Sequence, residues 1–227
     1  MTSFLMATVW LATAAAPAYS PPSQPPTTRY YFILFGGQSV PFIPRTAHTF
    51  ATFVKVTTTD KNDPIVETVT ISWLPVDGKV HPWRLRTVEG KNFSLEETLA
   101  LAARDNVRVS MWGPFEIDAA RYESAVVQAK LLASGAVRYR VLDSLGRNRR
   151  VSHCVHAVTY ADPQLQWLRQ PVLRVGEPGT SKLAIKYAES GAFLSPETHD
   201  WLLPLLGLDQ QPIIRRELGE IVPRQWR

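Results

Sequence analysis

The stretch RYYFILF at residues 29–35 and the stretch AHTFATFVKVT at residues 47–57 together predict the centre of a β-sheet. The first is aromatic and β-branched and runs into two glycines, which is the composition of a buried strand. In the second, side chains alternate between two faces, so that His48 and Phe50 point the same way. A loop rich in Asp, Asn and Pro leads to a third expected strand at residues 65–74. The second and third strands are expected to form an antiparallel hairpin.

Helical patterns alternate irregularly with these strands. Ser94 followed three residues later by Glu97 is a capping box, which predicts a helix over residues 95–104. Asp118 is expected to cap a longer helix that closes at Gly135. Further expected elements are strands at 107–112 and 137–143, a helix at 153–160 capped by Ser152, and helices at 180–189 and 196–206, the last capped by Ser195. Because the regular βαβ order of a doubly wound sheet is missing, the fold class is predicted to be α+β, an antiparallel sheet packed with helices.

The first residues of the chain differ in composition from the rest. Residues 1–18 carry no charge, contain a short apolar run, and end with small residues at Ala16 and Ala18 that fit an A-x-A cleavage site. They predict a signal peptide, and therefore export to the periplasm or the extracellular space. Residues 19–28 are expected to be a Pro-rich linker. The alternative is an apolar N-terminus on a cytoplasmic protein. The apolar run is too short for a membrane span, so no stable membrane insertion is expected after the leader is removed.

Composition limits the classes of function. A length of 227 residues, with 45% apolar and 20% charged residues, fits one folded domain or one domain with a small appendage. The net charge of +5 comes from scattered Lys and Arg, without the stripe of cations and exposed aromatics that nucleic-acid binding requires. Nucleic acid is therefore not expected as a partner, whereas an anionic cell wall or lipid head group is compatible with the charge. A single cysteine excludes an intramolecular disulfide and a zinc site built from several thiolates.

That cysteine, Cys154, is the residue on which covalent chemistry would depend. If Ser152 caps the helix, Cys154 lies at its second position, where free backbone N–H groups and the helix dipole favour a thiolate. The same N–H groups would be donors for an oxyanion. The alternative is that Cys154 is a small buried apolar side chain.

The stretch VSHCVHAVTYAD at residues 151–162 resembles the Asn-Cys-x-His-(Phe/Ala) helix start of the circularly permuted NlpC/P60 proteins, a papain-like superfamily that includes the lecithin retinol acyltransferase-like branch. The resemblance implies a strand histidine that precedes the nucleophilic cysteine in the chain, an order that His48 and Cys154 follow. It implies that His48 is the general base for Cys154 and that Ser72 orients the imidazole. Thr70 and Glu67 are the alternatives for this third role.

The sequence departs from the family pattern at two positions. Ser72 stands where the family has His, Glu, Asn or Gln, and His153 stands where Asn is frequent. The domain division that follows from the resemblance is a permuted papain-like core over residues 29–162 and a C-terminal helical extension over residues 163–227, packed on the core.

His153 and His156 flank the cysteine and raise the question of a metal. On a helix, Cys154 and His156 point about 200° apart, and the chain has no pair of histidines four residues apart. We therefore expect no metal site, and no cofactor.

These observations predict an exported thiol hydrolase or acyltransferase that acts on an amide or ester bond through Cys154 and His48, with a peptide, cell-wall or lipid substrate. The alternative hypothesis is a non-catalytic exported binding or structural domain in which Cys154 is buried.

Overall fold

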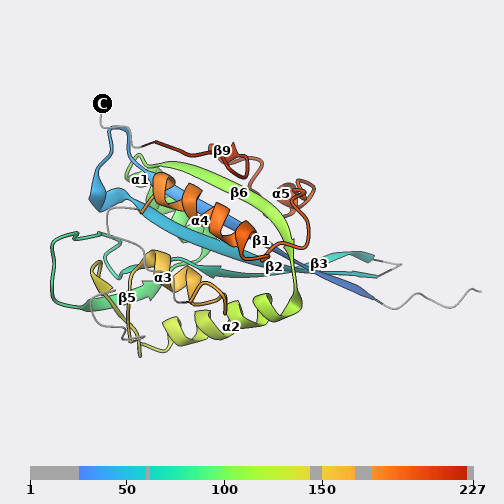
Figure 1. The fold of residues 1–227 in the computed structure, drawn as a ribbon, viewed down its shortest axis with the longest axis horizontal. Coiled ribbons are helices and arrows are strands. Elements are labelled where there is room, and N and C mark those ends of the chain that lie inside the picture. The colour runs from blue at the N-terminus through green and yellow to red at the C-terminus, as the bar shows by residue number, and fades with distance from the viewer. Residues whose placement is uncertain (1–25, 60–61, 144–149, 167–174, 224–227) are drawn as a thin grey trace, which may run out of the picture.

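A computed structural model describes residues 26–59, 62–143, 150–166 and 175–223, and the predicted signal peptide lies outside these ranges. Its main element is a five-stranded sheet in the order β3-β2-β1-β6-β9 (Figure 1). All neighbours in this sheet are antiparallel except β6 and β9, which are parallel. Its strands are β1 (Thr27–Gln38), β2 (His48–Thr59), β3 (Asn62–Ile71), β6 (Arg108–Ile117) and β9 (Ile213–Arg216).

The central pair β1 and β2 forms because both strands can be buried on both sides. Phe35 stands opposite Phe50 and their rings stack at 4.7 Å, while Phe32 stands opposite Phe53. Within each strand, residues of odd number and residues of even number therefore point into two different cores. The apolar side chains on both faces of these strands thus specify a central position in the sheet.

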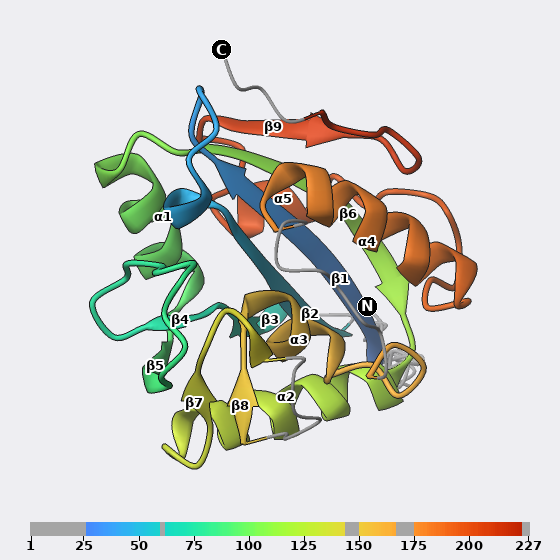
Figure 2. The same ribbon diagram turned by 60° about the vertical axis from the view of Figure 1, so that its left-hand side comes forward.

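Helices cover both faces of this sheet (Figures 1 and 2). The first core lies between the sheet and α2 (Ala119–Ala133), α3 (Cys154–Thr159) and α4 (Glu177–Glu189). The second core lies between the opposite face and α1 (Leu95–Arg104) and α5 (Leu202–Leu205). Helix α4 approaches β1 closely at Gly36, where an added Cβ would come within 2.6 Å of the Thr180 hydroxyl. The α+β class predicted from the sequence is confirmed.

A second, smaller sheet has the order β4-β5-β7-β8 and lies beside α2 and α3. Its strands are β4 (Trp73–Pro75), β5 (Val88–Asn92), β7 (Arg138–Tyr139) and β8 (Val151–Ser152), and a short 3-10 helix, η1 (Pro44–Thr46), precedes β2. The Trp73 side chain is fully buried and donates from Nε1 to the carbonyl of Ser152, which ties the small sheet to the start of α3. This small sheet positions the residues around Cys154.

Two helix starts are formed as the sequence predicts. Ser94 and Glu97 make the complete capping box of α1, and the Asp118 side chain accepts from the N–H of Arg121 at the start of α2. Both caps are local in sequence and need no tertiary contact.

Other elements differ from the expectations. β6 does not stop before Gly113 but continues to Ile117. Gly113 adopts a φ of 95° and lies opposite an irregularity in the register of β1. Only glycine fits there, because a Cβ atom would collide with the carbonyl of Phe32. The strand expected at 137–143 is only two residues long, and the helix expected at 196–206 is confined to α5.

The C-terminal part also contributes to the main sheet. Helix α4 begins three residues earlier than expected and packs on β1, and β9 adds an edge strand beside β6. Within the described part of residues 163–227, α4 therefore packs on the main sheet and β9 belongs to it. Among the described helices, none combines the length and apolarity that crossing a membrane demands.

Candidate functional site

Cys154 is the first residue of α3, and the preceding residue caps the helix. The cap is His153 rather than Ser152: its Nδ1 accepts the N–H groups of Val155 at 3.1 Å and His156 at 3.4 Å. The Ser152 hydroxyl instead donates to the carbonyl of His153. Two N–H groups that could have held an oxyanion at the helix start are therefore already bonded to His153.

The Cys154 thiol is buried, with 2% of the residue exposed. Burial raises the pKa of the thiol to about 11, and backbone hydrogen bonds from Thr49 and Val155 oppose this rise only in part. At neutral pH the group is a thiol, not the thiolate that acts as a nucleophile. The position at a helix N-terminus does not overcome the loss of hydration.

His48 lies on the other face of the main sheet. Its ring stacks on Phe50 at 5.4 Å and lines a small cavity with Thr98 and Leu101 of α1. Phe50 belongs to the core under α1, whereas Cys154 packs in the core under α2, α3 and α4. The structure does not bring His48 and Cys154 together. Successive side chains of β2 point to opposite faces of the sheet, and His48 is on the face away from Cys154.

The structure does bring His48 and Ser72 together. His48 Nε2 lies 2.9 Å from the Ser72 hydroxyl, which accepts at 2.7 Å from the hydroxyl of Thr98. His48 and Ser72 are buried, and burial lowers the pKa of His48 to about 3. This hydrogen-bonded group joins β2, the end of β3 and α1, and we interpret it as part of the core on that face.

The two alternatives for the third role are also engaged elsewhere. The Thr70 hydroxyl lies 3.0 Å from that of Thr52, and Glu67 accepts from Lys55 at 2.7 Å on the surface. Neither side chain is paired with the His48 ring.

Cys154 lies in the wall of an apolar cavity of about 360 Å³ between η1, the 80–83 loop and the small sheet. The lining consists almost entirely of apolar and aromatic side chains, with His153 and the thiol as polar exceptions. Its residues are Phe42, Pro44, Ala47, Val80, Pro82, Trp83, Tyr139, Val141, Leu142, His153, Cys154 and Val175. Trp83 is 85% exposed, so it stands at the opening of the cavity.

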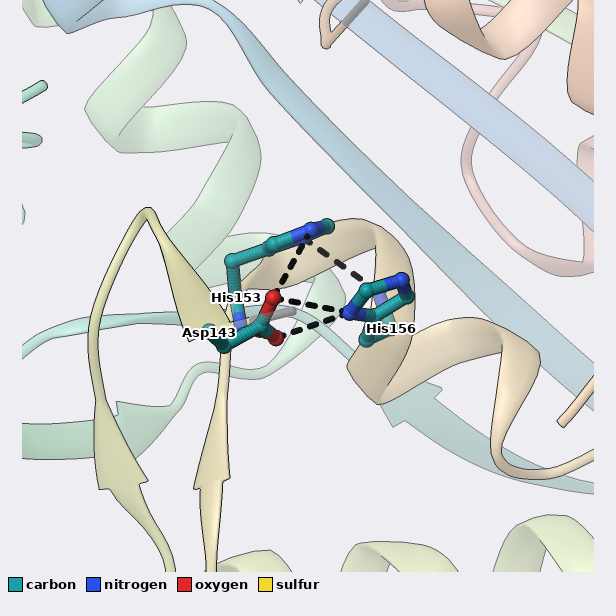
Figure 3. A group of neighbouring side chains, drawn as sticks. All are labelled: Asp143, His153 and His156. Carbon is teal, nitrogen blue, oxygen red and sulfur yellow. Dashed lines mark hydrogen bonds and ion pairs between the residues drawn. The ribbon is translucent and has the colours of Figure 1, made fainter. Parts of the chain in front are cut away.

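Beside the cavity, Asp143, His153 and His156 form a buried cluster (Figure 3). Both Asp143 oxygens lie within 2.9 Å of His156 Nδ1, and Oδ2 accepts the backbone N–H of His153 at 2.6 Å. The two imidazole rings stack with their centroids 4.1 Å apart. Asp143 thereby fixes the start of α3, and with it the position of Cys154.

Three potential metal-ligand atoms of this cluster lie within 4.8 Å of one another, a spacing that one metal ion could bridge. Because His153 Nδ1 accepts two backbone N–H groups, the proton of its neutral ring is on Nε2. Nε2 lies 3.3 Å from Asp143 Oδ1, without hydrogen-bond geometry to any described residue. A metal at Nε2 would need the proton to move to Nδ1, where it would oppose the two backbone N–H groups. The donor set fits a hydrogen-bonded helix cap better than a metal centre.

Sequence reasoning missed Asp143 and the cavity wall. The spacing of His153 and His156, three residues apart, puts their rings side by side and could have indicated a common partner. Nothing local identifies Asp143 as that partner, since it lies ten residues earlier in the chain.

No family model, curated protein or solved structure matches this chain. The similarity to the permuted papain-like proteins therefore depends on the motif at residues 151–162 alone and stays a prediction.

Proposed function

We propose that this domain is a non-catalytic binding domain that takes a small, uncharged, apolar ligand in the cavity beside Cys154. The observation that carries the proposal is the cavity wall, which among the described residues contains no Lys, Arg, Asp or Glu. A charged ligand group buried there would lose its hydration without gaining a partner, which costs several kcal/mol.

Size supports the same proposal. The cavity volume of about 360 Å³ lies within the range of small-molecule sites, which is roughly 300 to 1,000 Å³. Trp83 at the opening offers an aromatic surface that could close over the ligand.

A neutral fluorescent probe, N-phenyl-1-naphthylamine, tests the proposal by titration. Val141→Trp would fill the cavity from its wall, and we expect it to weaken probe binding at least tenfold. Val127→Trp is the matched control, because Val127 is 67% exposed on α2 and outside the cavity. Far-ultraviolet circular dichroism would establish that each variant is folded.

Protection of Cys154 gives a second measurement that needs no substitution. A bound probe should slow the reaction of Cys154 with N-ethylmaleimide, since the thiol lies in the same wall. If the folded Val141→Trp variant binds the probe like wild type and Cys154 is unprotected, the cavity is not the site.

A thiol hydrolase or acyltransferase is the second candidate. It is favoured by one observation, namely that Cys154 begins a helix and also lines the cavity, so that a bound acyl group would lie beside the sulfur. Incubation with a p-nitrophenyl acyl ester distinguishes the two candidates. Attack by the thiol would form a thioester on Cys154 and release p-nitrophenol, which the mass of the protein and the absorbance would both record. The binding proposal expects neither in excess of Cys154→Ser.

Export belongs to the proposal and has its own test. If residues 1–18 are a signal peptide cleaved after Ala18, the mature protein recovered from a secreting host begins at Tyr19. A product that retains residues 1–18 inside the cell would contradict export, and would leave the ligand proposal as it stands.

A further inference from the structure

The loop between β4 and β5 exposes an alternation of apolar and cationic side chains. Trp83, Arg84, Leu85 and Arg86 are four consecutive exposed residues, with Trp83 at 85% and Leu85 at 69%. A turn closed by the hydrogen bond from Arg84 N to the carbonyl of His81, 3.1 Å long, shapes the start of this segment. Large apolar side chains this exposed are common singly, but a pair that alternates with two arginines indicates a surface with a partner.

A third arginine joins the two of the loop. Arg84, Arg86 and Arg140 line one small notch, and Arg140 Nη1 lies 3.5 Å from the carbonyl of Leu85 as a donor. No carboxylate of the described chain forms an ion pair with any of the three guanidinium groups. The Nε atom of Arg140 is buried without a hydrogen-bond partner among the described residues. Three neighbouring guanidinium groups that form no ion pair with a described carboxylate indicate an anionic ligand.

We propose that residues 83–86 and Arg140 dock the domain on an anionic membrane surface. The three arginines would bind lipid phosphate groups, while Trp83 and Leu85 would enter the boundary between head groups and acyl chains. The contact is peripheral, since only the four residues 83–86 and Arg140 beside them supply it.

The position of the loop connects this surface to the cavity. Trp83 belongs to both, so that docking would place the opening of the apolar cavity against the membrane. On the proposed function, the ligand would then be a lipid or a compound dissolved in the bilayer, and it would reach the cavity without crossing water.

A membrane fits the surface better than a nucleic acid does. Single-stranded nucleic acid is bound by several aromatic side chains on which successive bases stack, whereas this loop offers one indole and an aliphatic leucine. Leu85 has no role in binding phosphates or bases, but it gains free energy by leaving water for acyl chains.

Co-sedimentation of the full chain with vesicles tests docking. We expect binding to phosphatidylcholine vesicles that contain about one third phosphatidylglycerol, weaker binding to pure phosphatidylcholine, and a decline with added salt. Arg84→Gln combined with Arg86→Gln should weaken binding to the anionic vesicles by about 5-fold for each arginine. Trp83→Ala combined with Leu85→Ala should weaken binding to both kinds of vesicle.

Two control pairs match these variants elsewhere on the surface. Arg104→Gln with Arg215→Gln removes the same charge from arginines that are paired with Asp105 and Asp200. Trp201→Ala with Leu205→Ala removes another exposed Trp and Leu, which are 49% and 48% exposed. Both control pairs should sediment like wild type.

Equal sedimentation of the loop variants and the controls would overturn docking. So would an oligonucleotide that binds through Arg84 and Arg86 while the vesicles do not. The neutral probe separates this proposal from the proposed function: probe binding without vesicle binding removes only docking, and vesicle binding without probe binding supports docking while removing the ligand in the cavity.

Discussion

The His48 ring and the Cys154 thiol lie on opposite faces of the five-stranded sheet, although the N–H of the very next residue, Thr49, is bonded to the thiol. The backbone of β2 thus passes directly beside Cys154 while the His48 side chain points away. A pair that is correct in chain order is therefore not a pair in space. This relationship is the reason for preferring binding over catalysis.

Alkylation of Cys154 by iodoacetamide should be slow in the native protein and should rise with pH toward a pKa of about 11, because burial disfavours the thiolate. His48→Ala should leave the profile unchanged, since the ring is on the other face. Rates are followed by mass spectrometry across the pH range. A fast reaction with a pKa below about 8.5 that His48→Ala slows would restore the catalytic pair.

Stability should fall as the pH is lowered below 6.5. The pKa of His48 is lowered to about 3 and that of His153 to about 4, from 6.5, mainly by burial. The unfolded chain therefore binds more protons than the folded protein between these values, so unfolding is favoured as pH falls. Each histidine should contribute about 1.4 kcal/mol per pH unit between about pH 6 and pH 4.

Urea unfolding at a series of pH values measures this slope. His153→Asn keeps a side chain that can cap α3 but removes the titration, so it should make the slope shallower. The exposed His81, changed to Asn, is the control. A wild-type free energy of unfolding that is constant from pH 6.5 to 4 would show that these two histidines are not held neutral.

Replacement of Glu177 should lower the free energy of unfolding more than replacement of most other charged residues. Its side chain is fully buried, accepts from Arg108 Nη2 at 2.5 Å, and also accepts from the Ser110 hydroxyl. Glu177→Gln removes the buried negative charge that Arg108 pairs with, and it should cost about 3 to 5 kcal/mol of unfolding free energy. Glu189→Gln at the other end of α4 breaks only an exposed pair with Lys186 and should cost at most about 0.5 kcal/mol. Equal losses in chemical denaturation would contradict this ranking.

Asp143→Ala should destabilise the protein by about 3 kcal/mol, because it removes the buried carboxylate that contacts both the His153 N–H and His156 Nδ1. Adding Zn²⁺ should not raise the melting temperature of the wild-type protein if the cluster is a helix cap. Differential scanning fluorimetry with and without Zn²⁺ measures both effects. A zinc-dependent rise that His156→Ala abolishes would instead identify a metal centre.

Local patterns predicted much of the secondary structure. The capping box at Ser94, the cap at Asp118 and the alternation in β2 each depend on residues within a few positions, and they appear as expected. The strand after Gly113 was not predicted, because the glycine and proline that normally end a strand here fit an irregularity of the neighbouring β1. The edge strand β9 was missed because its pairing with β6 joins residues about a hundred positions apart.

For the candidate site, the sequence identified Cys154 at a helix start and His48 on a strand, and it paired His48 with Ser72. It expected a free helix N-terminus around Cys154, whereas the His153 ring occupies the N–H groups there. A side chain that caps its own helix can be read from sequence when it is Ser, Asp or Asn, but His is rarely considered for this role.

By itself, the sequence determined the fold class, the helices capped by Ser94 and Asp118 and the alternation of the second strand, since periodicity and local hydrogen bonding decide these. The tertiary structure alone decided on which face of the main sheet each candidate functional side chain lies, and which side chains it contacts there. His48 and Cys154 are separated by the sheet, Asp143 is joined to His153 and His156, and the wall of the cavity is gathered from segments far apart in the chain. The physical reason is that the environment of a titratable or nucleophilic group depends on neighbours brought in by packing, and these neighbours leave no local pattern in the sequence.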